Sequence, residues 1–224
     1  MNYAQRRETL ARQLPKNSIA IIANPMPKRR SGDQDYPYRP DSNMIYLTGM
    51  DEAGAVAIIA SSDQDVRFRL FVLKRDLNLE RWTGPRYGVE GAVAKFGADE
   101  AFPIDELDEK LKDIMLPLDE VFFDFSYSQE LASKLFDITE SLRHRGRHSA
   151  EGPRRFADIR DIVGEMRRIK DDDEIEVLKR AAHVSAEGFK NVLAMLKPGV
   201  GEWEVEATLK HTFRVNGAMG ESFG

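Results

Sequence analysis

The chain has 224 residues, of which 42% are hydrophobic and none is cysteine, so disulfides, thiolate metal sites and a cysteine nucleophile are excluded. Lys plus Arg number 33 against 38 for Asp plus Glu, and the formal charge of −5 gives no overall basic field for nucleic acid. The longest apolar runs fall short of the roughly 20 residues of a membrane span, and residues 1–13 lack the apolar core of a secretory signal. We therefore expect a soluble, cytoplasmic protein without membrane or nucleic-acid partners.

Residues 1–155 predict a mixed α/β domain. An amphipathic helix at the start ends before Pro15. Apolar runs and alternation predict strands at Ser18–Ala23, 44–48, 54–60, 66–73 and 120–125. The strands from 44 to 73 are separated by short polar turns, which favours adjacent antiparallel strands. Apolar residues three and four apart predict helices at 104–114 and 131–142. The charged segment 143–155 is interpreted as a solvated junction that ends the domain.

Residues 156–170 predict a linker helix, and residues 171–224 predict two more helices. Asp171 suits the N-cap of the first, because the next three residues are acidic and complement the positive end of the helix dipole. This helix ends at Lys197-Pro198-Gly199, and the next begins near Glu202. Their apolar stripes have no sheet within 171–224 to cover them. We interpret this segment as the incomplete start of a second domain, with exposed hydrophobic surface.

The carboxylate and histidine residues do not form a convincing catalytic set. A dinuclear metal site needs several carboxylates and a His that converge from different strands, whereas Asp171 and the three acids after it are consecutive on a helix. His144 and His148 have the spacing of zinc peptidase ligands, but a glycine lies between them and no Glu follows His144, so a surface loop is expected. His183 and His211 flank the apolar stripes of the late helices. No catalytic residue or metal ligand is therefore predicted.

Trp82 is the candidate binding residue, together with Arg86. Both lie in the Gly- and Pro-containing stretch 80–88, for which we expect a loop with a partly exposed Trp. Exposed aromatic residues beside Arg commonly mark binding surfaces. A Trp that covers the edge of the sheet is an equally good interpretation of the residues alone.

Three segments resemble aminopeptidase P, the Xaa-Pro aminopeptidases, in the group that includes prolidase and creatinase. The first is Tyr36–Gly49, in which Arg39 and Asp41 precede an aromatic stretch that stops at a Gly. The others are the stretch Trp82–Gly88 and a run from Met166–Lys170 through the Asp171 helix and Lys197-Pro198-Gly199 to Glu202–Glu206. The resemblance covers essentially the whole chain. It implies a creatinase/prolidase-type N-terminal domain with a mixed sheet, followed by the first helices of a truncated α+β pita-bread domain.

By this resemblance, the intact enzyme releases the N-terminal residue from peptides with proline second, using a hydroxide that bridges two divalent ions, typically manganese. The two Asp, one His and two Glu that bind these ions in the family lie beyond the position that matches Gly224. The chain alone is therefore expected to bind no metal and to be inactive. The resemblance also implies a homo-oligomer, in which Trp82, with Arg86, contacts the substrate of a neighbouring subunit.

Two alternatives stay open. One is a fragment of a prolidase-type dipeptidase, since the preferred substrate length depends on the second domain. The other is a non-catalytic binding or assembly module derived from the same fold.

Overall fold

The computed structural model describes residues 1–61, 66–126, 129–144 and 152–221. The chain divides into two compact units, one comprising Asn2–Arg168 and the other Ile169–Gly224 with Met1. Each unit is described by itself. Within the described residues, none of the helices combines the length and apolar character that a membrane span requires.

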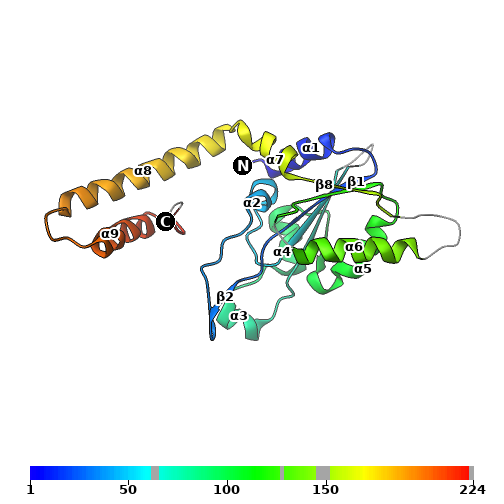
Figure 1. The fold of residues 1–224 in the computed structure, drawn as a ribbon, viewed down its shortest axis with the longest axis horizontal. Helices are drawn as coiled ribbons and strands as arrows, with labels where there is room; N and C mark the ends of the chain where they lie inside the picture. Colours follow the sequence, from blue (N-terminus) through cyan, green and yellow to red (C-terminus); the bar gives the residue numbers. More distant parts are fainter. Residues whose placement is uncertain (62–65, 127–128, 145–151, 222–224) are drawn as a thin grey trace. The chain divides into compact units, whose positions relative to one another are not determined.

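A mixed six-stranded sheet, in the order β6-β5-β4-β1-β7-β8, forms the centre of the first unit (Figure 1). Its strands are β1 (Ser18–Ala23), β4 (Val56–Ser61), β5 (Val66–Val72), β6 (Glu100–Pro103), β7 (Glu120–Phe123) and β8 (Arg155–Asp158). The pairs β1–β4 and β4–β5 are antiparallel, whereas β5–β6, β1–β7 and β7–β8 are parallel. A separate short hairpin joins β2 (Arg29–Ser31) to β3 (Gln34–Asp35).

Helices cover both faces of this sheet. They are α1 (Tyr3–Gln13), α2 (Ser42–Thr48), α4 (Gly88–Phe96), α5 (Leu107–Met115), α6 (Gln129–Arg143) and α7 (Arg160–Arg168), with a 3₁₀ turn at Ile104–Glu106, whereas the short helix α3 (Leu77–Thr83) lies in the connection from β5 to α4 and buries no residue. Residues of α1, α2, α4 and α7 share one hydrophobic core cluster, and residues of α5 and α6 share the other. Successive residues of β1 alternate between the clusters, with Ala20 in the first and Ile21 in the second. The first unit is a three-layer α/β structure, which confirms the predicted fold class.

The stretch 44–48, predicted as a strand, is helical, and that prediction was wrong. The Asp41 carboxylate caps α2 by accepting hydrogen bonds from the backbone N–H groups of Asn43 and Met44, both at 2.8 Å. Gly49 ends the helix in the left-handed conformation, with φ of 72°. The buried residues Met44, Leu47 and Thr48 follow a helical period. The aromatic and β-branched residues Ile45 and Tyr46 suggested a strand, but the cap and the period determine the structure.

The first unit also extends further along the chain than the predicted boundary at residue 155. The strand β8 pairs in parallel with β7, in the register Glu120↔Arg155. The compact unit continues through α7, where the Tyr46 hydroxyl donates to the Met166 carbonyl at 3.2 Å. Residues 156–168, predicted as part of a linker helix, thus supply an edge strand and a packed helix. The sequence analysis also missed β6, α4 and the β2–β3 hairpin.

Replacing Asp41 with Ala is expected to lower the free energy of unfolding of the chain by about 1 kcal/mol, because two N–H groups at the start of α2 lose their acceptor. Urea denaturation followed by circular dichroism measures the change. The matched control is Asp113→Ala, which removes an exposed carboxylate from the body of α5 and should change the free energy by less than about 0.5 kcal/mol. Equal effects of the two substitutions would contradict the capping role.

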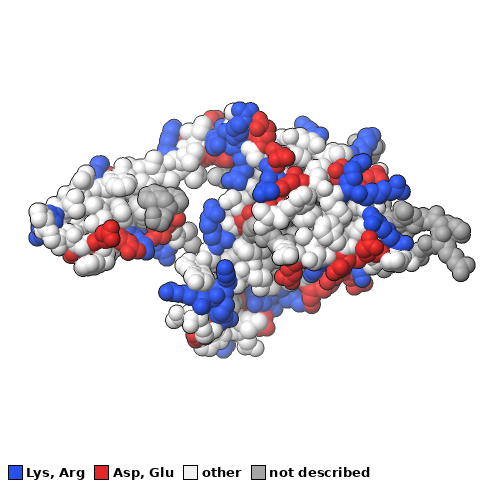
Figure 2. Space-filling model, in the orientation of Figure 1, with Lys and Arg blue, Asp and Glu red and all other residues white. Residues whose placement is uncertain are grey.

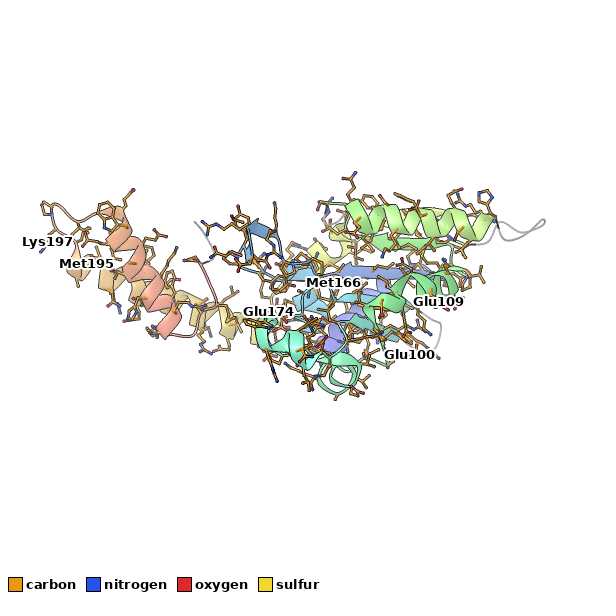
Figure 3. The ribbon with its side chains drawn as sticks, turned by 90° about the horizontal axis from the view of Figure 1, so that it is seen from below. Glu100, Glu109, Met166, Glu174, Met195 and Lys197 are labelled. Atoms are coloured by element: carbon orange, nitrogen blue, oxygen red, sulfur yellow. The ribbon has the colours of Figure 1, made fainter. Side chains whose placement is uncertain are left out.

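The second unit pairs two helices, α8 (Asp172–Met195) and α9 (Glu202–Val215). Figure 3 labels Met195 at the end of α8 and Lys197 in the turn that follows. Asp171 is the N-cap of α8, as predicted, and it forms a capping box: its side chain accepts from the Glu174 N–H, and the Glu174 side chain accepts from the Asp171 N–H. Gly188 lets α9 approach closely, because a Cβ there would lie 2.8 Å from the Phe213 ring.

Much apolar surface of this helix pair is exposed, as the sequence predicted. The exposed large apolar residues of α8, α9 and their flanks are Ile169, Ile175, Val177, Leu178, Phe189, Leu193, Leu196, Trp203, Val215 and Met219.

Candidate functional site

Trp82 is the most exposed aromatic side chain among the described residues, with 88% of its surface accessible. It lies on α3, inside the segment 73–87 that connects β5 to α4 and is called here the Trp82 loop. No residue of α3 is buried. The prediction of a loop at 80–88 was therefore wrong for residues 80–83, which are helical. The interpretation that Trp82 covers the sheet edge is also wrong, since a covering side chain would itself be buried.

Local hydrogen bonds explain why this short exposed segment is helical. The Asp76 carboxylate accepts from the N–H groups of Asn78 at 2.9 Å and Leu79 at 3.2 Å, which caps the N-terminus. Gly84, with φ of 86° and ψ of 167°, ends the helix in a conformation that only glycine adopts readily. The helix is thus defined at both ends although its apolar side chains are exposed.

Glu80 anchors α3 from within the loop. Its carboxylate accepts from Arg75 Nε at 3.2 Å and from Arg75 Nη2 at 3.0 Å, a bidentate pair, and from the Asp76 N–H at 3.0 Å. The hydrogen bonds from Arg75 lower the pKa of Glu80, and Glu80 in turn raises the pKa of Arg75. The Glu80 side chain is only 8% exposed, whereas its partner Arg75 is 53% exposed, so the pair lies at the surface with its carboxylate largely covered.

The two ends of the Trp82 loop are held at its base. The Glu52 carboxylate accepts from the Leu73 N–H at 3.0 Å and from the Tyr87 N–H at 2.9 Å. Arg86 Nη1 donates to the Lys74 carbonyl at 3.0 Å. The structure therefore places Arg86 at the base of the loop, whereas Trp82 lies on α3. The two predicted site residues share one loop, but they have different positions in it.

The Tyr87 side chain ties the loop to its neighbours. Its hydroxyl donates to Asp51 Oδ1 at 2.9 Å and accepts from Lys95 Nζ at 2.8 Å. Its ring meets the Phe96 ring edge to face, with 4.8 Å between centroids. The hydrogen bond to Tyr87 raises the pKa of Lys95, which keeps the ammonium charged. Tyr87 thus fixes the end of the loop to α4.

Charges of both signs surround this site. Figure 2 shows acidic and basic side chains interspersed over the visible face of the first unit, with a small group of basic side chains where Figure 1 draws β2. That strand contains exposed Arg29 and Arg30, and Arg29 Nε lies 3.1 Å from Asp35 Oδ1. The visible face therefore carries a local basic group without an extended surface of one sign.

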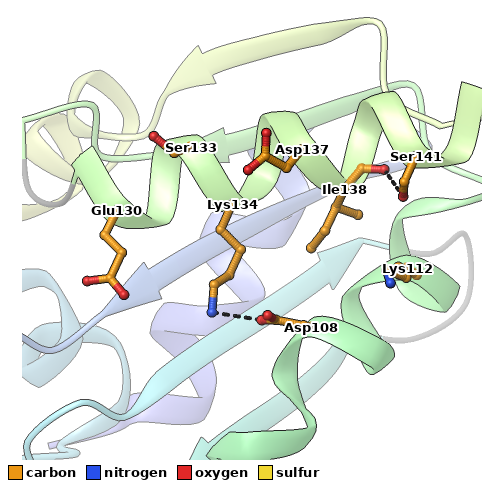
Figure 4. A pocket seen from close by; sticks show the side chains of 8 residues that line it. All are labelled: Asp108, Lys112, Glu130, Ser133, Lys134, Asp137, Ile138 and Ser141. Atoms are coloured by element: carbon orange, nitrogen blue, oxygen red, sulfur yellow. Dashed lines mark hydrogen bonds and ion pairs between the residues drawn. The ribbon is translucent and has the colours of Figure 1, made fainter.

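A groove between α5 and α6 has a volume of about 580 Å³ (Figure 4). Its lining residues are Asp108, Lys112, Glu130, Ser133, Lys134, Asp137, Ile138 and Ser141. Lys134 Nζ lies 2.7 Å from Asp108 Oδ1, and the Ser141 hydroxyl donates to the carbonyl of Ile138 at 2.7 Å. No His lies among these residues to activate a serine, so the lining has no nucleophile–base pair.

Within the described residues, no group of three or more His, Asp or Glu side chains could hold a metal ion. His144 is exposed after α6, with Nε2 3.9 Å from Glu140. His148, the other residue of the candidate pair, lies outside the described residues. His183 and His211 are exposed on α8 and α9. The residues described here therefore do not fit a dinuclear metal centre.

Tyr38 contains a buried polar atom close to the base of the Trp82 loop. Its hydroxyl oxygen is buried and has no hydrogen-bond partner among the described residues. Burial, and then the charges of Asp51, Asp41 and Glu52, raise the pKa of Tyr38 to about 12. The folded chain therefore keeps this phenol protonated at pH values where an unfolded chain would ionise it.

Replacing Tyr38 with Phe is expected to leave stability near pH 7 unchanged or slightly higher, because no hydrogen bond is lost. Above pH 10, the wild-type free energy of unfolding should fall relative to the variant until about pH 12, by roughly 1 kcal/mol once solvent screening of this half-buried group is allowed for. Urea denaturation of both chains from pH 7 to pH 11 measures the difference. A clear loss of stability at pH 7 in the variant would show that the hydroxyl has a partner.

The sequence analysis missed Glu52, Glu80 and Asp76. Asp76 and Glu80 carry a local signal, since an Asp followed at a short interval by a Glu commonly starts a helix. Glu52 carries none, because its partners Leu73 and Tyr87 are 21 and 35 residues away in the sequence.

Known proteins similar to this chain agree on one family. The family described as "Aminopeptidase P, N-terminal domain" matches residues 3–122. The Xaa-Pro aminopeptidase of Escherichia coli strain K12 is 32% identical over 225 residues, which cover 99% of this chain and 50% of that protein. The Xaa-Pro aminopeptidase of Haemophilus influenzae is 29% identical, covering 94% and 46% respectively. This chain spans about half the length of the curated relatives it matches.

Solved structures are similar over the same extent. The structure titled "Proline aminopeptidase P II from Yersinia pestis" superposes with a TM-score of 0.94 and 34% identity, covering 99% of this chain and 51% of that one. A structure of E. coli aminopeptidase P has a TM-score of 0.94 and 31% identity, with the same coverage. The fold described above is therefore that of the N-terminal half of these proteins.

Proposed function

Because this chain belongs to the family of aminopeptidase P N-terminal domains, we propose that it forms the N-terminal half of a working Xaa-Pro aminopeptidase. The complete enzyme releases the N-terminal residue from peptides whose second residue is proline. The matches to bacterial Xaa-Pro aminopeptidases over nearly the whole chain support this assignment. Its activity belongs to the complete protein, since the chain spans only half of those relatives.

The test of this function is an assay of the complete protein that contains this chain. It should cleave tripeptides with proline second and leave matched tripeptides with alanine second intact. Cleavage of Xaa-Pro dipeptides alone would favour a prolidase-type dipeptidase. A folded complete protein without activity on either class would favour a non-catalytic binding module.

Aminopeptidase P enzymes are metal-dependent, and we propose manganese as the metal of the complete enzyme. The residues described here do not fit a dinuclear site. We therefore assign no chemical step to them, and the metal ligands would come from the half of the relatives that this chain does not match.

The 224-residue chain by itself is expected to show no manganese-dependent cleavage of Xaa-Pro peptides, because the described residues bring no metal-binding cluster together. Isothermal titration with Mn²⁺ and a peptide assay of the same preparation measure this. Saturable binding of one or more Mn²⁺ per chain in the micromolar range would contradict the expectation.

Within the complete enzyme, we propose that Trp82 contacts peptide substrate bound by a neighbouring subunit of a homo-oligomer. The observation that carries this proposal is an 88% exposed Trp on a loop whose base is closed by several hydrogen bonds. A large aromatic side chain that is exposed and held in place suits recognition, because little conformational entropy is lost when it binds. Arg86 contributes by closing the base of the loop.

We also propose a cytoplasmic location, which the lack of cysteine supports. One plant relative is named as mitochondrial. Cell fractionation with antibodies against the complete protein distinguishes the two locations.

A further inference from the structure

The Trp82 loop runs from the end of β5 to the start of α4, and the Glu52 carboxylate bonds to both of its ends, beside the hydrogen bond from Arg86 to the Lys74 carbonyl. Glu52 Oε1 accepts from the N–H of Leu73, the first residue after β5, and Glu52 Oε2 accepts from the N–H of Tyr87, the last residue before α4. Compact surface loops with adjoining ends are Ω-loops, and many of them are functional. Glu52 closes this one.

Glu52 is itself fixed to the central strand of the sheet. Asn24 follows β1, is only 4% exposed, and donates from Nδ2 to the Glu52 carbonyl at 2.9 Å and to the Met50 carbonyl at 3.1 Å. The Asn24 N–H donates to the Ala55 carbonyl at 2.8 Å. The backbone of Glu52 is therefore held relative to β1, and the carboxylate links the two ends of the loop to that backbone.

Hydrogen bonds and ion pairs fix the direction of this loop, because the apolar side chains of α3, Leu77, Leu79 and Trp82, are all exposed. A carboxylate that accepts two N–H groups forms charge-assisted bonds, which are about twice as strong as neutral ones. A glutamine of the same size offers one acceptor oxygen and turns an NH₂ group toward the other N–H. The change from Glu to Gln therefore removes one of the two hydrogen bonds that join the loop ends, without changing the size of the side chain.

We propose that Glu52 is the positioning residue that presents Trp82 to substrate, by joining the two ends of the loop that carries it. This inference rests on the proposed role of Trp82. It assigns Glu52 no contact with substrate. Glu52 affects the reaction only by fixing the position of Trp82.

A double-mutant cycle in the complete enzyme tests whether Glu52 acts through Trp82. Glu52→Gln is expected to lower kcat/KM for Xaa-Pro peptides by about 10-fold, as misplacement of a positioned group commonly does. In the Trp82→Ala background the same substitution should lower it by less than about 2-fold, because residues that act through one another are not additive. The matched control, Glu109→Gln, removes an exposed carboxylate on α5, labelled in Figure 3, and should have no effect in either background.

Hydrogen exchange of the same proteins, followed by mass spectrometry, separates positioning from general loss of structure. Glu52→Gln should speed exchange in peptides that cover 73–87 by about 10-fold or more and leave peptides from β1 and β4 unchanged. If Glu52→Gln does not yield folded enzyme, Glu52→Asp serves in its place, since the shorter side chain cannot reach both N–H groups.

The outcomes distinguish the two proposals. An equal loss of kcat/KM from Glu52→Gln in both backgrounds, or unchanged exchange in 73–87, overturns the positioning role while the role of Trp82 stands. Unchanged kinetics in Trp82→Ala alone means that the proposed role of Trp82 fails, and the inference about Glu52 falls with it, even where exchange in the loop is faster.

Discussion

Trp82→Ala in the complete enzyme is expected to lower kcat/KM for Xaa-Pro peptides by roughly 30-fold, which corresponds to about 2 kcal/mol and is typical of an aromatic residue at the centre of a recognition surface. The free energy of unfolding should stay within about 0.5 kcal/mol of wild type, because the side chain is 88% exposed in this chain. Steady-state kinetics with a series of Xaa-Pro peptides and urea denaturation measure the two quantities.

Two control variants sharpen this test. Val93→Ala shortens an exposed apolar side chain on the neighbouring helix α4 and should leave the kinetics unchanged. Trp82→Phe keeps an aromatic face and should recover part of the loss. If the enzyme is a homo-oligomer in which Trp82 acts on a neighbouring subunit, mixing Trp82→Ala subunits with subunits inactivated at their metal site should raise activity above that of Trp82→Ala alone, because the metal-inactive subunits supply Trp82 to intact sites. Wild-type kinetics in Trp82→Ala would remove Trp82 from the substrate site.

Phe68→Ala is expected to lower the free energy of unfolding of the chain by about 4 kcal/mol. Phe68 is 2% exposed on β5 and lies in the hydrophobic cluster beneath α1, α2, α4 and α7. The loss is a large fraction of the 5–15 kcal/mol that usually separates folded and unfolded chains. Denaturation in guanidinium chloride, with the slope compared between variants, measures it.

A charged neighbour adds to the expected cost. The Arg7 guanidinium lies 4.1 Å from the centroid of the Phe68 ring and donates to the Leu47 carbonyl at 3.2 Å. Burial lowers the pKa of Arg7, which shows that its charge sits in an unfavourable environment, and the ring face offsets part of that cost. Removing the ring leaves both a cavity and a less stabilised cation.

Arg67→Ala is the matched control, since Arg67 is the preceding residue of β5 and is exposed. It should change the free energy by less than about 0.5 kcal/mol. Phe68→Leu should cost less than Phe68→Ala, because it leaves a smaller cavity. A loss below about 1 kcal/mol in Phe68→Ala would mean that the core collapses around the site, and the packing described here would need revision.

The residues of the sequence predicted the mixed α/β domain because its signals are local. The apolar run Ser18–Ala23 and the period from Leu107 to Leu111 each report on one element, and both elements have the predicted type. The cap at Asp171 was also readable, since its partner Glu174 is three residues away. The family resemblance came from several such segments together.

Two elements did not follow from the residue preferences alone. The segment Ser42–Thr48 has residues that favour a strand, but the Asp41 cap, a buried helical stripe and the left-handed Gly49 make it a helix. The strand β8 exists because β7 offers it a partner, which short-range patterns do not report. In the first case neighbouring cap residues and the helical stripe overrode strand propensity, and in the second a tertiary contact created the strand.

The sequence by itself determined the α/β class, the helix cap at Asp171, the exposed stripes of α8 and α9, and Trp82 as the residue to examine. Only the tertiary structure decided that Trp82 lies exposed on a helix and that Glu52 joins the ends of its loop. The physical reason is the range of the interactions. Caps and periodicity act over three or four residues, whereas the Glu52 carboxylate meets partners 21 and 35 residues away, and only folding brings them within hydrogen-bond distance.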